Sequence, residues 1–273
     1  MQTTIKTAVS LSGIGLHSGK NVNLKLIPAE KDMGIVFRTS DGMSIYAKFD
    51  NVQSTNMSTK LSNSHCTVDL VEHLMAGLWG CNIDNLIIDI DANEVPIMMG
   101  NAKSFIDEIM KVGIIEQDAL KKKFKIKNPI EVREDDKYVI IKPNDKGLII
   151  DMTIDFDHPL IGKQRFIFDS LKNSFIDEIA PARTFGFMRD LEYLNKNGLG
   201  LGASLDNCIG LTDDSIANEN GLIFPDEFVR HKILDCIGDL FLSGYYLDCH
   251  VIAYKSSHKL NNIALRELFE YNL

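Results

Sequence analysis

The sequence predicts an α+β fold whose two halves each layer a β-sheet on helices. In both halves strand patterns come first and helical patterns follow, which is typical of this fold class. A break near residues 113–128, where a glycine ends a helix and a polar, lysine-rich stretch follows, separates the halves. The 273 residues are enough for one large domain or two ordinary ones. We therefore expect one domain over residues 1–120 and a second over residues 121–273.

The first half opens with strands. Val22–Ile27 alternates between polar and apolar residues, and Gly34–Arg38 is a short apolar run that ends in a charge. Over residues 68–80 the apolar residues change to helical spacing, so we expect a helix there that ends at a glycine. A strand at Leu86–Asp91 and a helix at Ser104–Val112 complete this half.

The second half again has strands before helices, although no sequence repeat relates it to the first. Five lysines between positions 121 and 127 precede it, and we interpret them as a solvated linker face rather than a binding patch. The expected elements in chain order are strands at Ile130–Arg133, Tyr138–Lys142 and Leu148–Phe156, helices at 187–197 and 226–243, a strand at His250–Tyr254 and a helix at 261–271.

Composition and charge exclude several classes of protein. Hydrophobic residues make up 45% of the chain and charged residues 25%, as in a globular protein. The formal net charge of -9 disfavours general nucleic-acid binding, although a local basic pocket for a diphosphate stays open. We expect neither a signal peptide nor a transmembrane segment, because no sufficiently long apolar stretch occurs. The five cysteines form no CxxC pair, which predicts free thiols in a reducing cytoplasm.

The clearest chemical feature lies on the helix expected at 226–243. His231 and Asp235 are four residues apart, which separates them by only about 40° around a helix, so both side chains leave the same face. An imidazole and a carboxylate placed in this way can bind one divalent metal ion. The same spacing is also typical of an ordinary hydrogen-bonded pair, and the pattern alone leaves both interpretations open.

Glu72 and His73 are neighbours on the helix expected at 68–80. Neighbouring helical residues point about 100° apart, so both would not bind one ion. They could divide the work instead, His73 holding a metal and Glu72 acting as general base. The alternative is an amphipathic helix with two polar residues on its wet side.

A third histidine, His258, follows the last predicted strand and is expected in a loop. A loop histidine can serve as a general acid or as an electrostatic stabiliser, although most have no special role. Asp239, on the same helix as His231, could orient such a histidine and keep it protonated.

Two other patterns carry no chemistry of their own. GIGLHSGK at 13–20 fails both the P-loop spacing and the GxGxxG spacing, so we interpret it as a glycine-rich turn. The pair Met98 and Met99 is expected to pack in the interior.

Longer motifs connect these features to a known family. They are GIGLHSGK (13–20), VEHLMAGL (71–78), PIMMGNA (96–102), DFDHP (155–159), ARTFGFMRD (182–190), GLGLGASLDN (198–207), DEFVRHKILDCIGDL (226–240) and YKSSHKLNN (254–262). With these motifs in this order, almost the whole chain resembles the UDP-3-O-acyl-N-acetylglucosamine deacetylases, zinc enzymes at the committed step of lipid A synthesis. The resemblance implies two α+β domains, each a sheet layered on helices, with the active site between them.

The resemblance also implies a role for individual residues. By role, they are His73, His231 and Asp235 as ligands of one catalytic zinc ion, with iron(II) as the alternative metal; Glu72 as general base; His258 as cationic acid supported by Asp239; Thr184 as the hydroxyl near the oxyanion; and Lys232 and Phe185 as substrate-binding residues. An insert near residues 188–204 would form a hydrophobic passage for the acyl chain. Met99 stands where the family usually has Asp, and Ala203 where glycine is common, which puts the acyl-chain preference in doubt.

The expected function is hydrolysis of the N-acetyl group of UDP-3-O-(3-hydroxyacyl)-N-acetylglucosamine, with release of acetate, by a cytoplasmic monomer. Two alternatives stay open. One is a zinc amidohydrolase that acts on another acylated sugar nucleotide. The other is a catalytically silent sugar-nucleotide-binding protein, which would predict an altered Glu72 or an altered set of zinc ligands.

Overall fold

The computed structural model describes residues 1–272 and confirms the α+β fold class. The elements of the N-terminal half are β1 (Gln2–Ile5), β2 (Val9–Ile14), β3 (Asn21–Pro28), β4 (Ile35–Thr39), β5 (Ser44–Tyr46), the 3₁₀ turn η1 (Phe49–Asn51), β6 (Val52–Ser54), β7 (Lys60–Ser62), β8 (Thr67–Val68), α1 (Glu72–Gly80), β9 (Leu86–Ile90), α2 (Lys103–Val112) and β10 (Ile114–Gln117). Those of the C-terminal half are β11 (Lys123–Lys125), β12 (Ile130–Glu134), β13 (Lys137–Pro143), β14 (Leu148–Phe156), β15 (Gly162–Asp169), the π-helical turn η2 (Phe175–Ile179), β16 (Phe185–Phe187), the 3₁₀ turn η3 (Met188–Asp190), α3 (Leu191–Lys196), β17 (Ile209–Leu211), α4 (Glu227–Phe241), β18 (Tyr246–Tyr254) and α5 (His258–Asn272).

The two large sheets share one topology, although the sequence contains no repeat that would indicate it. The strand order is β2-β3-β9-β4-β5 in the first sheet and β12-β13-β18-β14-β15 in the second, which β11 extends by pairing with β18. The central strands β9 and β18 each pair antiparallel with one neighbour and parallel with the other. In both halves one helix precedes the central strand (α1, α4) and another follows it (α2, α5). The chain therefore uses one α+β arrangement twice.

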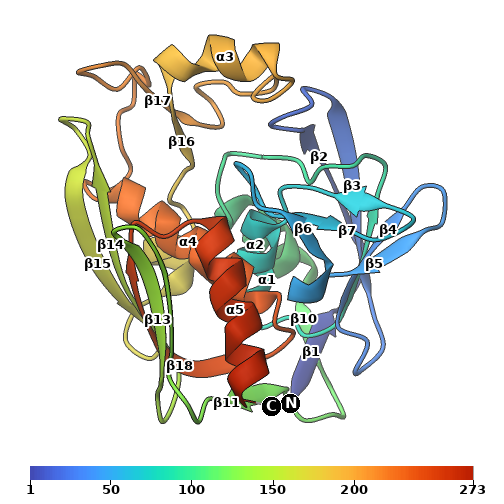
Figure 1. The fold of residues 1–273 in the computed structure, drawn as a ribbon. Helices are drawn as coiled ribbons and strands as arrows, with labels where there is room; N and C mark the ends of the chain where they lie inside the picture. Colours follow the sequence, from blue (N-terminus) through green and yellow to red (C-terminus); the bar gives the residue numbers. More distant parts are fainter. Residues whose placement is uncertain (273) are drawn as a thin grey trace.

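The helices α1, α2, α4 and α5 lie between the two large sheets (Figure 1). On β3 the side chains of Val22, Leu24 and Leu26 are buried, while the residues between them are exposed, so one face of this sheet packs inward. The core does not divide at the boundary between the halves, because one continuous hydrophobic cluster joins buried side chains of both. The division at residue 120 stays a prediction.

The central helices α1 and α4 are buried on nearly all sides. In α1, residues 72–78 are buried, and in α4 every residue except Arg230 and Lys232 is buried. A charged group in such a position needs an ionic or hydrogen-bonding partner, or a metal ion. The acidic residues and histidines on these two helices therefore indicate where a functional site lies.

Two predicted helices were wrong in extent. Helix α1 begins at Glu72 and not at residue 68, because Leu70 has a φ of 58°, a left-handed conformation that a helix cannot include. The helix expected at 187–197 is shorter, since Phe187 belongs to β16 and regular helix covers only Leu191–Lys196.

Two segments expected as loops are structured. Residues 113–128 contain β10, which pairs with β1, and β11. Their lysines are not all solvated, because Lys121 forms a 2.7 Å ion pair with Asp84 and its ammonium lies 4.1 Å from the ring centre of Tyr246. His258 is not a loop residue but the first residue of α5, whose helix begins before the predicted position 261.

Other expectations have mixed outcomes. All five cysteines, which lie within residues 1–272, are free thiols, as predicted. No helix in the described part of the chain combines the length and apolarity of a membrane span. Met98 packs against the hydrophobic core, but Met99 is 54% exposed, so the prediction that both pack inside was wrong for Met99.

Candidate active site

His73, His231 and Asp235 meet where α1 packs against α4. One potential ligand atom of each lies within 4.8 Å of the other two, and all three residues are buried. Nε2 of each histidine lies 3.4 Å from Oδ1 of Asp235. The two imidazole rings are nearly perpendicular, with centres 5.0 Å apart. The structure thus brings together three residues that the sequence places on two separate helices.

This cluster fits a divalent metal ion. A tetrahedral ion with bonds of about 2.0–2.1 Å holds its ligand atoms roughly 3.3–3.4 Å apart, which agrees with both measured distances. Oδ1 of Asp235 is buried and receives no hydrogen bond from residues 1–272, although buried carboxylate oxygens normally have a partner. Nδ1 of His231 faces the carbonyl oxygen of Ala182 at 3.1 Å, so Nε2 is left for the metal.

The protonation of the cluster also suits metal binding. Burial lowers the pKa of His231 to about 3, so its imidazole is neutral near pH 7. Burial acts to raise the pKa of Asp235, but His231 and the ammonium of Lys232 hold this pKa well below its usual value. Nζ of Lys232 lies 2.6 Å from Oδ2 of Asp235. Lys232 therefore contacts a ligand residue, and its role towards a substrate stays a prediction.

A second group of ionisable residues begins beside the cluster. Glu72, the first residue of α1, faces His258, with 3.6 Å between Oε1 and the ring atom Nε2. The other ring nitrogen of His258, Nδ1, lies 2.8 Å from Oδ2 of Asp239. A carboxylate, an imidazole and a second carboxylate therefore follow one another next to the His-His-Asp cluster.

The surroundings raise the pKa values of both Glu72 and His258. Burial raises the pKa of Glu72 to about 7, against the attraction of His258 and His73. Burial acts to lower the pKa of His258, but the carboxylates of Asp239 and Glu72 outweigh it and raise this pKa to about 9. Between these values Glu72 is a carboxylate and His258 is a cation, so one site holds a group that can accept a proton and a group that can donate one.

Thr184 directly precedes β16, and Phe185 is the first residue of that strand. The backbone N–H of Thr184 donates to the carbonyl oxygen of Gly100 at 2.8 Å, and its own carbonyl oxygen accepts from the N–H of Ile209. The ring of Phe185 packs edge-on towards the ring of His231, with 6.3 Å between centres. Phe185 thus borders His231 of the cluster, while the substrate contacts expected of Thr184 and Phe185 stay predictions.

The insert near residues 188–204 contains η3, α3 and a glycine-rich loop, and α3 stands at the outer edge of the fold (Figure 1). Large apolar side chains are exposed in and next to it: Met188 at 44%, Leu201 at 52% and Leu205 at 45%. The loop is tied to the first half by a hydrogen bond from the N–H of Leu201 to the carbonyl oxygen of His17. Such side chains suit contact with an acyl chain, and the passage stays a prediction.

Two buried residues that were not among the predicted site residues complete the site. Thr59 donates from its backbone N–H to Oε2 of Glu72 at 3.0 Å, and from its hydroxyl to Oδ1 of Asp239 at 2.6 Å. Asn261 donates from Nδ2 to Oδ2 of Asp239 at 2.8 Å. Thr59 and Asp239 are 180 positions apart in the sequence, so no local pattern could have shown this contact.

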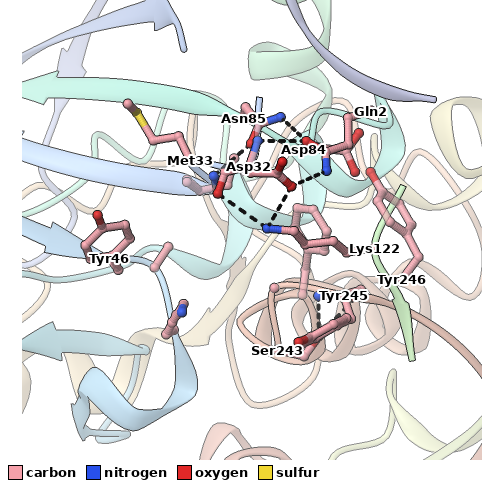
Figure 2. A pocket seen from close by; sticks show the side chains of 16 residues that line it. Gln2, Asp32, Met33, Tyr46, Asp84, Asn85, Lys122, Ser243, Tyr245 and Tyr246 are labelled. Atoms are coloured by element: carbon pink, nitrogen blue, oxygen red, sulfur yellow. Dashed lines mark hydrogen bonds and ion pairs between the residues drawn. The ribbon is translucent and has the colours of Figure 1, made fainter. Parts of the chain in front are cut away.

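A separate pocket lies between the β4–β5 hairpin and the turn that follows α4 (Figure 2). Inside it Lys122 faces Asp32, with Nζ 3.3 Å from the carboxylate, and Gln2 also donates to that carboxylate. The lining of this pocket, drawn from residues 1–272, includes none of the predicted site residues. It is not part of the candidate active site.

A buried His-His-Asp cluster beside a carboxylate and a carboxylate-supported histidine, on an α+β scaffold, is typical of a metalloenzyme. The comparison with protein families gives the particular class. A sequence model of the family described as UDP-3-O-acyl N-acetylglycosamine deacetylase matches residues 2–270, and the chain belongs to this family.

Individual relatives agree with this assignment. The chain is 48% identical to UDP-3-O-acyl-N-acetylglucosamine deacetylase of Oleidesulfovibrio alaskensis, over 99% of this chain and 89% of the relative. It is 46% identical to the enzyme of the same name from Histophilus somni, over 98% of this chain and 90% of the relative. The corresponding protein of Acinetobacter baumannii is 47% identical with the same coverage.

Proposed function

We propose that this protein is a zinc-dependent deacetylase that hydrolyses the N-acetyl group of UDP-3-O-(3-hydroxyacyl)-N-acetylglucosamine and releases acetate. One observation carries the proposal: the buried cluster of His73, His231 and Asp235 lies directly beside the Glu72–His258 pair. Family membership supports the choice of substrate. A silent sugar-nucleotide-binding protein would not need this set of groups.

The residues present divide the hydrolysis between them. His73, His231 and Asp235 would hold the zinc ion, which supplies a Lewis acid that polarises the amide carbonyl. The ionised carboxylate of Glu72 takes a proton from the attacking water as the new C–O bond forms. The cation of His258 stabilises negative charge that develops nearby.

The second half of the reaction needs an acid. As the C–N bond breaks, the leaving nitrogen takes a proton, and His258 can give it from Nε2, the ring atom that faces Glu72. Asp239 accepts from Nδ1 of the same ring and so favours the tautomer and the charge that this step requires. The products are acetate and the free amine of the sugar.

Binding of the substrate is assigned to residues around this centre. We propose that Lys232 and Phe185 contact the sugar nucleotide, that the Thr184 hydroxyl contacts the oxyanion, and that the insert near 188–204 receives the acyl chain. The exposed apolar side chains of that insert support the last assignment. We further propose that the enzyme works as a monomer. We also propose that it works in the cytoplasm, since free thiols are typical of a reducing compartment.

The test is incubation of the purified protein with the UDP-linked acylated N-acetylglucosamine, followed by detection of acetate and of the free amine. We expect turnover that stops after chelation and returns with zinc; a comparison of zinc and iron(II) in the same assay identifies the effective metal. Turnover that survives complete removal of metal would overturn the mechanism. Faster release of acetate from another acylated sugar nucleotide would reassign the substrate.

The variants Glu72→Gln and His231→Ala separate the two parts of the site. Glu72→Gln should keep bound zinc but lose activity by about 10²–10⁴-fold, as expected for a lost general base. His231→Ala should lose the metal itself, measured by elemental analysis of the purified protein. A Glu72→Gln variant with full activity would exclude Glu72 as the base.

A further inference from the structure

The segment between β6 and β7 brings a buried hydroxyl into the active site. Ser58 and Thr59 in this segment are only 2% and 1% exposed, and a polar side chain at that depth needs hydrogen-bond partners. The preceding residue, Met57, has a φ of 65°, which is unfavourable for a residue other than glycine. The backbone therefore holds Thr59 in its position at some conformational cost.

Thr59 contacts two of the ionisable groups at once. Its backbone N–H donates to Oε2 of Glu72 and its hydroxyl donates to Oδ1 of Asp239. Its carbonyl oxygen accepts from the N–H of Val71, the residue before Glu72, at 3.3 Å. One residue of the first half therefore holds the proposed base directly and reaches the proposed acid through Asp239.

The hydroxyl of Thr59 also restricts rotation of the Asp239 carboxylate. Oδ2 of Asp239 receives hydrogen bonds from Nδ1 of His258 and from Asn261, both at 2.8 Å. Oδ1 receives the hydrogen bond from Thr59 at 2.6 Å. With both oxygens held, the carboxylate plane is fixed, and the ring of His258 that it supports is fixed with it.

From this geometry we infer that Thr59 is a positioning residue for the amide hydrolysis. Its hydroxyl fixes the Asp239 carboxylate, so that His258 keeps its orientation towards Glu72. This inference rests on the proposed deacetylase function, because the orientation matters only if His258 protonates the leaving nitrogen. Thr59 itself reaches the reacting groups only through Glu72 and Asp239.

The test compares Thr59→Val with Thr59→Ser in the zinc-loaded enzyme. Valine keeps the shape and the backbone N–H but lacks the hydroxyl, whereas serine keeps the hydroxyl. We expect Thr59→Val to lower kcat about 10- to 100-fold, the loss of one hydrogen bond to a charged group, with KM changed less than about twofold. Thr59→Ser should restore kcat to within about threefold of the wild type. Equal losses in both variants, or an unchanged kcat in Thr59→Val, would overturn the inference.

A matched control separates positioning from general loss of stability. Thr4 is also a buried threonine, 2% exposed, and its hydroxyl accepts a hydrogen bond from the N–H of Ala29. Thr4→Val should lower the melting temperature in the way that Thr59→Val does, yet leave kcat unchanged. If Thr4→Val lowers kcat as strongly as Thr59→Val, the effect is one of stability and the inference fails.

A spectroscopic readout keeps the inference distinct from the proposed function. In ¹⁵N spectra of zinc-loaded protein, the ring-nitrogen signals of His258 should shift in Thr59→Val and stay in place in Thr59→Ser. Absence of acetate release by the wild type would refute the proposed function, whereas unchanged His258 signals in Thr59→Val would refute the positioning role. Because Thr59 is inferred to act through Asp239, the double variant Thr59→Val/Asp239→Asn should be no slower than Asp239→Asn alone. Additive losses of kcat would show that the Thr59 hydroxyl acts independently of Asp239.

Discussion

Gly238 of α4 lies against the backbone of Glu72 in α1. A Cβ atom at position 238 would stand 2.0 Å from the carbonyl oxygen of Glu72, closer than any real contact allows. Only glycine lets the two helices approach so far, because it has no side chain. His231 and Asp235 precede Gly238 on the same helix, so this contact sets the spacing between the proposed base and two of the proposed metal ligands.

The substitution Gly238→Ala should therefore separate α4 from α1. We expect a loss of unfolding free energy of about 1–3 kcal/mol from overpacking, together with weaker zinc retention. Urea unfolding and elemental analysis measure the two effects. The control is Gly77→Ala on α1, where a Cβ would meet nothing closer than 3.4 Å and alanine should leave stability equal or slightly higher. Equal behaviour of the two variants would show that the close contact does not set the helix spacing.

The activity should depend on pH through both members of the Glu72–His258 pair. Activity needs Glu72 ionised, so it should rise as pH increases through the Glu72 pKa of about 7. It also needs His258 protonated, so it should fall as pH increases through the His258 pKa of about 9. A bound metal cation favours the ionised form of Glu72 and the neutral form of His258, so it lowers both pKa values. In the metal-loaded enzyme we therefore expect the acid limb at or below about pH 7 and the alkaline limb at or below about pH 9. Measurement of kcat/KM against pH gives the two limbs.

The variant Asp239→Asn assigns the alkaline limb. The Asp239 carboxylate raises the pKa of His258, so its neutralisation should move the alkaline limb to lower pH. Asp213→Asn, at a side chain that is 85% exposed, is the control and should leave the profile unchanged. An alkaline limb that stays in place in Asp239→Asn would mean that His258 does not titrate there.

The sequence predicted the fold class and most elements because their patterns are local. The strand at Leu148–Phe156 has the predicted bounds, since its buried and half-buried residues alternate from Leu148 to Asp155. The repeated topology was not predictable, because it resides in which strands pair, and pairing depends on residues far apart in sequence. Likewise Leu70 reads as one more apolar residue of a helix, and only its left-handed φ shows that it ends the preceding loop.

The candidate site, like the fold, was predictable from local patterns only in part. Spacing put His231 and Asp235 on one helical face and raised His73 and Glu72 as a possible ligand and base, and the resemblance to a family then joined the two helices in one site. Thr59 escaped notice because its role depends on a contact across 180 positions. Gly238 escaped as well, since a glycine within a helical pattern normally indicates weakness and not a close contact.

Glu72 should make the metal-free protein less stable at alkaline pH. Its folded-state pKa of about 7 lies above the ordinary value of 4.5, so the folded protein holds this proton more tightly than the unfolded chain does. The resulting stability is fully present below the unfolded pKa and is lost as pH rises through about 7. At pH 8 the ionised side chain therefore costs about 3 kcal/mol.

Glu72→Gln removes that charge and keeps an oxygen that can accept from the N–H of Thr59. We expect the metal-free variant to be more stable than the metal-free wild type at pH 8, with a gain that shrinks as the pH is lowered towards 5. Urea unfolding of chelator-treated proteins at both pH values measures it. A gain of the same size at both values would exclude ionisation of Glu72 as its cause.

The ion pair between Arg183 and Glu227 should stabilise the segment that borders the candidate site. Glu227 is fully buried. Its carboxylate accepts hydrogen bonds from Nε of Arg183 at 2.8 Å and from the backbone N–H of Arg183 at 3.0 Å. It also accepts one from the backbone N–H of Ile223 at 2.6 Å. Glu227→Ala leaves the largely buried guanidinium of Arg183, whose side chain is 12% exposed, without its carboxylate partner, so we expect a loss of about 3 kcal/mol. Because Arg183 follows Ala182, whose carbonyl oxygen faces His231, zinc affinity should fall as well.

An exposed ion pair provides the comparison. Arg189 and Asp213 lie 3.4 Å apart with side chains that are 57% and 85% exposed, and such surface pairs contribute at most about 1 kcal/mol. Arg189→Ala should therefore change neither the unfolding free energy by more than that nor zinc retention, as measured by urea unfolding and by competition with a chelator. Should Glu227→Ala prove as mild as Arg189→Ala, the Arg183–Glu227 pair does not support the proposed metal ligands, and the packing of α1 against α4 must then suffice to position His231.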